Sequence, residues 1–311
     1  MKITTKFLLA FALIFSNSAF AQRVVEFVIP FAQGGTADRL AAVVMPFLKQ
    51  ELAQINVNPV LAFRPGAGGA LGAGQVAKAD RLQILLAANA LVTVTIVNPQ
   101  AVTYSLEKDF VPLVYLGRFP MLLIVKSTSP INTWQDLKSH CKSNTISMGN
   151  SGVGSATHIA ATLVTDFIGC KTTHIPYKGI GQAMVDLLGN HTDALVDFVP
   201  SAKQHLDSGN LKAILSVDQQ RFDNVPSVKD IGFTNYDFDN WFVLAVNSNA
   251  PQAEIQQMQQ ALNAVMQKRE LLHQLEQLGV RGYNANLPSN FFVVQQQRFR
   301  QILRRVNVQT P

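Results

Sequence analysis

The chain has 311 residues, of which 26 are basic and 20 acidic, and 48% are apolar. This length allows two domains with a sizeable core, because a typical domain has about 100 to 200 residues. The basic excess is small, and its densest cluster, "RFRQILRR" at 298–305, suits the solvated face of a terminal helix. Nucleic acid is therefore not an expected partner.

The first 21 residues have the pattern of a secretory signal peptide. Lys2 and Lys6 precede an apolar run at 7–15, and the small-x-small sequence Ala-Phe-Ala follows at 19–21. The apolar run is too short to span a membrane, which takes about 20 residues. We expect cleavage before Gln22 and export to the periplasm. Removing 21 residues and their two lysines leaves 290 residues with 24 basic against 20 acidic side chains, a net charge of +4.

The rest of the chain alternates between strand-like and helix-like segments, which predicts an α/β protein with mainly parallel sheets. Strands are expected at 24–30, 57–63, 83–88, 111–117, 121–126, 144–149, 172–176, 193–198, 211–217 and 241–246. Apolar stripes at helical spacing predict helices at 38–53, 251–278 and 288–306. Pro46 predicts a kink or an early break in the first of these helices, and Ser289 or Asn290 can cap the last.

The stretch "VIPFAQGGTAD" at 28–38 ends a strand at a Gly34-Gly35 pair and continues at once as a helix. The first N–H groups of a helix have no partner within the helix, and the helix dipole favours an anion there. We expect the backbone of Gly34, Gly35 and Thr36 to bind a carboxylate, while Asp38 caps the helix and orients water. The alternative is a tight strand–helix turn without a ligand.

A glycine-rich turn at 64–74, "RPGAGGALGAG", contains the formal dinucleotide fingerprint G-x-G-x-x-A at 72–77. That fingerprint needs a strand directly before its first glycine and an acid about 20 residues later. Here a long turn intervenes, and residues 89–91 are Asn, Ala and Leu. A nucleotide cofactor is therefore not expected.

A second strand–turn–helix stretch, "ISMGNSGVGSATH", lies at 146–158. If the two turns belong to different lobes, their helix N-termini can face each other across a cleft and hold one anion from both sides. Ser155 and Thr157 are then expected to bind the carboxylate. The alternative is an ordinary loop in which Ser155 caps the helix. No acid accompanies Ser155 and His158, so a nucleophile–base pair is not favoured, and His158 is expected to be a hydrogen-bond donor at the helix start.

No catalytic or metal-binding pattern was found: the sequence has no G-x-S-x-G, His-x-x-x-His or Cys-x-x-Cys, and its six histidines are scattered. Neither a catalytic residue nor a metal nor a cofactor is expected. Cys141 and Cys170 are the two cysteines of an exported chain and are expected to form a disulfide. Each precedes a predicted strand, so they lie side by side if those strands are parallel neighbours.

With these motifs in view, the chain resembles the solute-binding proteins of tripartite tricarboxylate transporters, also called the Bug family. The similarity covers nearly the whole mature chain and includes "PFAQGGTAD" at 30–38, "RPGAGG" at 64–69, "VNP" at 97–99, "EKDFVPL" at 107–113, "SGVGSATH" at 151–158, "IPYKGIGQAMVDLLGNHTDA" at 175–194, "NVPSV" at 224–228 and "WF" at 241–242. The chain departs from the family at Phe63 and Ala70, where polar residues are usual, and in "DRLQILL" at 80–86. These departures suggest a more apolar cleft.

The resemblance implies a type II periplasmic-binding-protein fold, in which two α/β lobes are joined by two crossover segments and a ligand cleft lies between them. Lobe 1 is expected to comprise 22–120 and 240–311, and lobe 2 to comprise 121–239, with hinges near 118–122 and 237–241 that close the cleft on ligand. The ligand-binding residues that the resemblance implies are Phe31, Gly34, Gly35, Thr36 and Asp38 of lobe 1, Gly154, Ser155, Thr157 and His158 of lobe 2, and Asn89 and Asp197 in the specificity region.

The expected function is that of a monomeric periplasmic receptor. It captures a small carboxylate, which can be a di- or tricarboxylate, an amino acid or an aromatic acid, and delivers it to the membrane permease of a tripartite tricarboxylate transporter. Two alternatives remain: a sensor-linked receptor that signals without transport, and an exported enzyme that uses the cleft as an active site. Thermal stabilisation by ligand without turnover would favour binding over catalysis.

Overall fold

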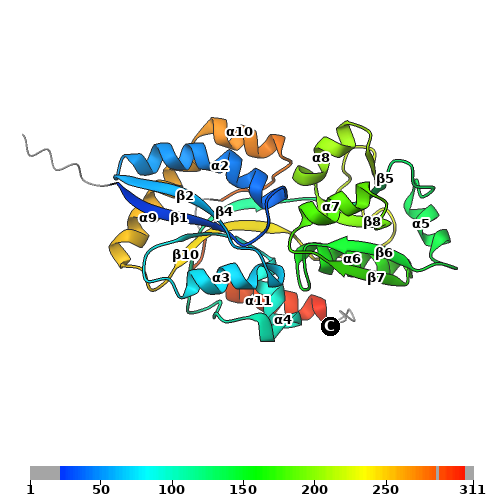
Figure 1. Ribbon diagram of the computed structural model, residues 1–311, viewed down its shortest axis with the longest axis horizontal. Coiled ribbons are helices and arrows are strands. Elements are labelled where there is room, and N and C mark those ends of the chain that lie inside the picture. Colours follow the sequence, from blue (N-terminus) through cyan, green and yellow to red (C-terminus); the bar gives the residue numbers. More distant parts are fainter. Residues whose placement is uncertain (1–21, 285–286, 305–311) are drawn as a thin grey trace, which may run out of the picture.

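The computed structural model describes residues 22–284 and 287–304, so the expected signal peptide at 1–21 lies outside the described residues. Two five-stranded sheets lie one beyond the other along the long axis of the molecule (Figure 1). Each sheet carries its own helices, which gives the expected two α/β lobes. Within the described ranges, no helix combines the length and the apolar character needed to cross a membrane.

Lobe 1 is built on the sheet with strand order β2-β1-β3-β10-β4. Its strands are β1 (Arg23–Ile29), β2 (Val57–Phe63), β3 (Ile84–Ala88), β4 (Phe110–Arg118) and β10 (Trp241–Asn247). Strand β1 pairs in parallel with β2 and β3, whereas β10 runs antiparallel to β3 and β4. The carboxyl ends of β1 and β3 therefore meet at one edge of this sheet.

Lobe 2 is built on the sheet with strand order β7-β6-β8-β5-β9. Its strands are β5 (Met121–Lys126), β6 (Ile146–Asn150), β7 (Thr172–Pro176), β8 (Ala194–Phe198) and β9 (Leu211–Ser216). Strand β6 pairs in parallel with β7 and β8, and β5 is antiparallel to β8 and β9. The chain passes from the first sheet to the second between β4 and β5, and it returns between β9 and β10.

Helices cover both faces of the lobe 1 sheet: α2 and α10 lie on one side, and α3, α4 and α11 on the other (Figure 1). The large buried side chains Phe27, Trp241 and Phe299 belong to the core that these layers enclose. The helices are α2 (Thr36–Ala53), η1 (Ala67–Gly69), α3 (Ala70–Ala77), α4 (Ala90–Val97), η2 (Pro99–Ala101), α5 (Trp134–His140), α6 (Ala156–Ile168), α7 (Ile180–Leu188), α8 (Val199–Asp207), α9 (Gln252–Val265), α10 (Arg269–Gln277) and α11 (Phe291–Leu303).

All ten predicted strands are present, but the sheets are mixed and not mainly parallel as expected, because each has two parallel and two antiparallel pairings. The helix predictions need three corrections. Helix α2 runs through Pro46 without a break. Both Pro46 and Ala42 are exposed, so water can reach the backbone carbonyl that the proline leaves unpaired. The helix expected at 251–278 is two helices, α9 and α10, separated at 266–268. Helix α11 begins after Asn290, whose side chain makes no capping hydrogen bond, and residues 305–306 of the predicted helix lie outside the described residues.

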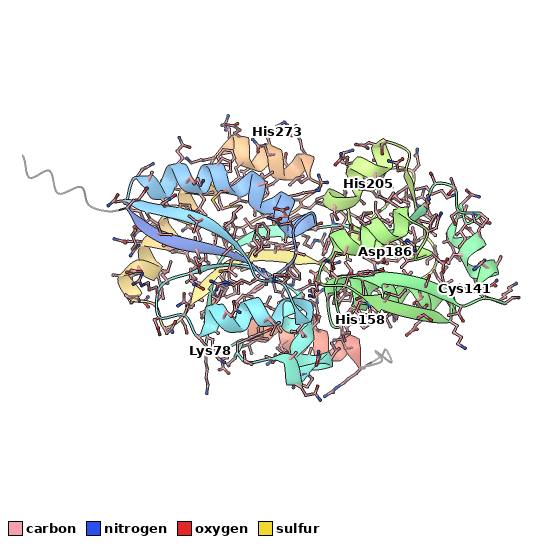
Figure 2. The ribbon with its side chains drawn as sticks, viewed as in Figure 1. Lys78, Cys141, His158, Asp186, His205 and His273 are labelled. Atoms are coloured by element: carbon pink, nitrogen blue, oxygen red, sulfur yellow. A yellow bond between two sulfur atoms is a disulfide. The ribbon has the colours of Figure 1, made fainter. Side chains whose placement is uncertain are left out.

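The predicted disulfide is present. Cys141 and Cys170 are bonded to each other, with their Cα atoms 4.9 Å apart. The strands that follow them, β6 and β7, are parallel neighbours, as the prediction required. Figure 2 shows Cys141 at the end of lobe 2 that lies away from lobe 1, so the bridge stabilises lobe 2 without contacting the cleft.

Candidate ligand-binding site between the lobes

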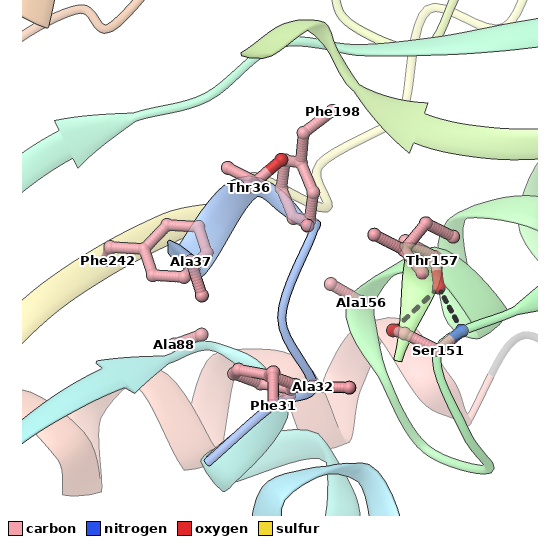
Figure 3. Close-up of a pocket in the computed structure, with 13 residues that line it drawn as sticks. Phe31, Ala32, Thr36, Ala37, Ala88, Ser151, Ala156, Thr157, Phe198 and Phe242 are labelled. Carbon is pink, nitrogen blue, oxygen red and sulfur yellow. Dashed lines mark hydrogen bonds between the residues drawn. The ribbon is translucent and has the colours of Figure 1, made fainter. Parts of the chain in front are cut away.

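A pocket lies between the two lobes, with walls from both (Figure 3). Its lining residues are Phe31, Ala32, Gly35, Thr36, Ala37, Ala88, Ala90, Ser151, Ala156, Thr157, Ile180, Phe198 and Phe242. The cavity volume is about 30 Å³. Since a water molecule needs roughly 10 to 15 Å³ of such volume, the closed pocket holds about two waters. A larger solute therefore enters when the lobes move apart, and the lobes then close around it less tightly than in this structure.

Five helices begin at this pocket. The first residues of α2, α4, α6 and α7 line it, and so does Phe198, the residue just before α8. These helices follow β1, β3, β6, β7 and β8, the strands joined by the parallel pairings, so their N-termini gather at the carboxyl ends of the two sheets. Each N-terminus carries roughly half a positive charge. The positive ends of five helix dipoles therefore lie at this one pocket.

On the lobe 1 side, the turn before α2 is held by its own side chain. The amide of Gly34 donates to Oδ2 of Asp38 at 2.9 Å, so this N–H, which we expected to bind ligand, already has a partner. Asp38 therefore stabilises the turn, in line with its expected capping role. The amides of Thr36 and Ala37 have no hydrogen-bond partner among the described residues, and both residues line the pocket.

On the lobe 2 side, the turn before α6 is held in a similar way. Ser155 Oγ accepts the amide of His158 at 3.2 Å and caps the helix, while the amide of Gly154 donates to His158 Nδ1 at 3.1 Å. His158 is thus an acceptor at Nδ1, and the expected donor role was wrong for that nitrogen. Within the described part of the chain, the amides of Ala156 and Thr157 find no partner, and both residues line the pocket.

Two hydroxyl groups complete the lobe 2 wall. Thr157 Oγ1 accepts the amide of Ser151 at 2.9 Å and lies 3.0 Å from Ser151 Oγ, the two contacts drawn in Figure 3. It also lies 3.1 Å from Ser155 Oγ. Ser151 and Thr157 line the pocket, whereas Ser155 is fully buried behind it. The hydroxyl-bearing residues that line the pocket from this turn are therefore Ser151 and Thr157, and not Ser155.

None of the lining residues is charged. Nine of them are alanine, isoleucine or phenylalanine, and the rings of Phe198 and Phe242, one from each lobe, lie 5.7 Å apart. His158 stands behind the lobe 2 turn, where burial and the neighbouring His174 lower its pKa to about 4. It is therefore neutral at pH 7. The lining therefore offers an anion backbone dipoles and hydroxyl groups, and most of its side chains are apolar. Phe63 and Ala70, from which a more apolar cleft was expected, do not line this pocket.

The structure brings four of the predicted site residues to the pocket itself: Phe31, Gly35, Thr36 and Thr157. The predicted residues that form the turns behind it are Gly34, Asp38, Gly154, Ser155 and His158.

Asn89 lies at the N-cap position of α4, fully buried, and its Nδ2 donates to Asp239 O and to Asn240 Oδ1. Asp197 is also fully buried and lines a different groove. Among the described residues, no group of three or more His, Cys, Asp or Glu side chains could hold a metal ion.

Sequence reasoning missed nine lining residues. Ser151, Ile180 and Phe242 stand in motifs that carried the family resemblance, so a signal for them was present. Phe198 follows directly after the predicted residue Asp197. The other five are the alanines at 32, 37, 88, 90 and 156. An alanine side chain gives no chemical signal in the sequence. These residues matter because their small side chains leave the backbone accessible.

The comparisons with known proteins agree with this architecture. Residues 41–308 match the model of the tripartite tricarboxylate transporter family receptor. Protein BugT of Bordetella pertussis is 27% identical over 265 residues, which cover 83% of this chain and 80% of BugT. The structure of the periplasmic binding protein BugD is 25% identical with a TM-score of 0.85, covering 93% of this chain and 99% of BugD.

The structure of MatC from Rhodopseudomonas palustris with bound malate is 22% identical with a TM-score of 0.80, covering 91% of this chain and all of that one, and shares the fold. The two-sheet architecture is thus that of the periplasmic solute-binding proteins. The chain belongs to the tripartite tricarboxylate transporter receptor family, the Bug proteins.

Proposed function

We propose that this receptor captures a small carboxylate in the pocket between its lobes. The observation that carries the proposal is the convergence of five helix N-termini on a pocket without a charged side chain. Several aligned helix dipoles favour an anion, whereas the same pocket offers nothing to neutralise a cation. The apolar wall suits the hydrocarbon part of an organic acid better than an inorganic ion.

The carboxylate oxygens are bound from both lobes. The amides of Thr36 and Ala37 donate from α2, and those of Ala156 and Thr157 donate from α6, with the hydroxyl of Ser151 beside them. A hydrogen bond to a charged group contributes about 1.5 to 3 kcal/mol, so a few such bonds give a useful affinity. Asp38, Ser155 and the other turn residues act by holding these amides in place. The fold can accommodate such a ligand, since MatC holds malate, a dicarboxylate.

Closure of the lobes is part of the proposed function. A ligand that contacts both lobes favours the closed state because it makes these contacts only there. We assign lobe 1 to 22–120 and 240–311 and lobe 2 to 121–239, with the movement at 118–122 and 237–241, where the chain passes between the sheets. The closed, loaded monomer then docks on the permease of a tripartite tricarboxylate transporter in the periplasm, after the leader at 1–21 is removed. No turnover of the ligand is expected.

A thermal-shift screen against a panel of mono-, di- and tricarboxylic acids, amino acids and aromatic acids tests this proposal. A ligand at 100 times its Kd stabilises the folded protein by about 2.7 kcal/mol, which a melting curve resolves easily. We expect at least one acid to raise the melting temperature and to be recovered unchanged after incubation. A flat response across the panel, or consumption of the acid, would contradict the proposal.

A further inference from the structure

A second groove lies on the other side of the first turn of α2. Its lining includes Arg39, Ile180, Gln182, Asp197, Ser201 and His205. Its volume is about 380 Å³, far more than that of the cleft pocket. Helix α2 of lobe 1 forms one wall, and β8, α7 and α8 of lobe 2 form the others. Figure 2 shows His205 on α8 at this position.

Two contacts between the lobes separate this groove from the cleft pocket. Thr36 Oγ1 lies 2.9 Å from Ser201 Oγ. Gly35 lies so close to Ile180 that a Cβ atom there would be 2.9 Å from Ile180 Cγ2. The wall between the two spaces is therefore one residue thick, and both spaces open when the lobes move apart.

Arg39 places a cation in this groove, and its charge also acts on the buried carboxyl of Asp197, where it partly offsets the rise in pKa that burial causes. Its Nη2 donates to Gln204 Oε1 at 3.2 Å, but among the described residues it forms no ion pair. Its Nε is buried and has no hydrogen-bond partner in the described part of the chain. Buried donors are nearly always paired, and arginine stays charged at any physiological pH. Arg39 lines the groove, so a buried guanidinium nitrogen without a partner beside that space points to a missing acceptor.

The other polar groups of the groove are compatible with an anion. Gln182 Oε1 accepts the amide of Lys178 at 3.3 Å, which leaves its NH₂ end as a donor, and the imidazole of His205 also lines the groove. Asp197 is the one acid of the lining. Its Oδ1 accepts the amide of Phe198 at 2.7 Å and its Oδ2 accepts Ser201 Oγ at 2.5 Å, so both oxygens are engaged within lobe 2. Burial also raises the pKa of Asp197 to about 7, which weakens its repulsion of an anion.

We propose that this groove is a second anion-binding site, in which the Arg39 guanidinium holds a carboxylate or another small oxyanion. Two kinds of molecule carry such an oxyanion. One is a diacid whose near carboxylate occupies the cleft pocket and whose far carboxylate lies in the groove, and this case rests on the function proposed above. The other is a free anion such as inorganic phosphate, which does not. Since the walls come from both lobes, a free anion stabilises the closed state. A diacid also contacts both lobes, but it reaches both spaces only by replacing the Thr36–Ser201 contact that separates them.

Calorimetric and thermal-shift titrations of three proteins test the proposal. They are the wild type, Arg39→Gln, and Lys49→Gln, which removes one positive charge from an exposed position of the same helix and serves as the matched control. The probes are succinate, glutarate and adipate, the monoacid butyrate, and inorganic phosphate. Arg39→Lys keeps the charge but not the planar guanidinium, and it replaces Arg39→Gln if that variant does not fold.

The titration results distinguish a bound diacid from a bound free anion. If the far carboxylate of a diacid binds, Arg39→Gln weakens at least one diacid by about tenfold or more and leaves butyrate unchanged. If a free anion binds, phosphate stabilises the wild type in a saturable way and this effect is lost in Arg39→Gln. Indistinguishable behaviour of Arg39→Gln and Lys49→Gln towards every probe would overturn the inference. If the wild type binds none of the acids, the proposed function fails, and the phosphate titration alone decides the inference.

Discussion

Thr36 Oγ1 and Ser201 Oγ lie 2.9 Å apart, although 165 positions separate the two residues. Thr36 opens α2 in lobe 1, and Ser201 lies in the first turn of α8 in lobe 2. Ser201 Oγ also lies 2.5 Å from Asp197 Oδ2. The bond between Thr36 and Ser201 can form only when the lobes are closed. It ties a pocket-lining residue of one lobe to a buried carboxyl of the other.

Closure of the two lobes also depends on the missing side chain at Gly179, which lets the backbone of lobe 2 approach Ala32 of lobe 1. A Cβ atom at this position would lie 2.8 Å from Cβ of Ala32 in the other lobe. We expect Gly179→Ala to hold the lobes apart and to weaken carboxylate binding by about ten- to a hundredfold, since overpacking costs roughly 1 to 3 kcal/mol. Small-angle scattering at saturating ligand should give the wild type a smaller radius of gyration than the ligand-free protein.

Gly179→Ala should retain the larger radius at the same ligand concentration. The second substitution Ala32→Gly removes the nearest clashing atom and should restore part of the affinity. Unchanged affinity and radius in Gly179→Ala would argue that the lobes do not close on the ligand.

The disulfide should make a large contribution to the stability of lobe 2. Cys141 and Cys170 are 29 positions apart. The chain-entropy model gives about 3 to 4 kcal/mol for a loop of this size. Urea unfolding of the double variant Cys141→Ser, Cys170→Ser should show a loss of this order, and dithiothreitol should destabilise only the wild type. Thiol titration of the unreduced, unfolded wild type should find no free thiol; two reactive thiols would refute the bridge.

His158 should make the protein less stable in mild acid. Burial, followed by the neighbouring His174, lowers its pKa from 6.5 to about 4 in the folded state. Between these values the unfolded chain binds more protons, so this contribution is complete above pH 6.5 and is lost as the pH falls through about 4. The full effect is roughly 3 kcal/mol. His158→Asn keeps an acceptor for the amide of Gly154, and its unfolding free energy should lack this pH dependence. Parallel pH profiles of variant and wild type would contradict the assignment.

Asp197 should have an effect on stability opposite to that of His158, because its contribution is largest in acid and is lost towards neutral pH. Burial raises its pKa from 3.8 to about 7, so the folded state binds the extra proton between these values. The contribution of the protonated form is therefore complete below pH 3.8 and is lost as the pH rises through about 7. Asp197→Asn imitates the protonated carboxyl, and its unfolding free energy should rise relative to the wild type as the pH rises from 4 to 7. A constant difference would show that Asp197 is ionised throughout.

The sequence predicted the positions of the helices and strands better than it predicted which groups bind one another in the turns at the pocket. Each strand is a β-branched or apolar run bounded by polar or glycine-rich segments, so all ten were found. The break between α9 and α10 was not, because residues 266–268 are Met, Gln and Lys, which carry no helix-breaking signal. Some features of the ligand pocket likewise have no signal in the sequence. The turns at Gly34-Gly35 and at 151–158 were visible, but the partners of Gly34 and Ser155 depend on side-chain directions that only the folded turns fix.

Calorimetric titration of the wild type with the best carboxylate from the screen, and with its amide, decides whether the helix N-termini bind the carboxylate. We expect that replacing the charged carboxylate by the neutral amide weakens binding by about 10- to 100-fold, because each hydrogen bond from the α2 and α6 amides to a charged group contributes about 1.5 to 3 kcal/mol. Acid and amide affinities that agree within about a factor of three would contradict this expectation, since the helix N-termini would then not be what holds the ligand.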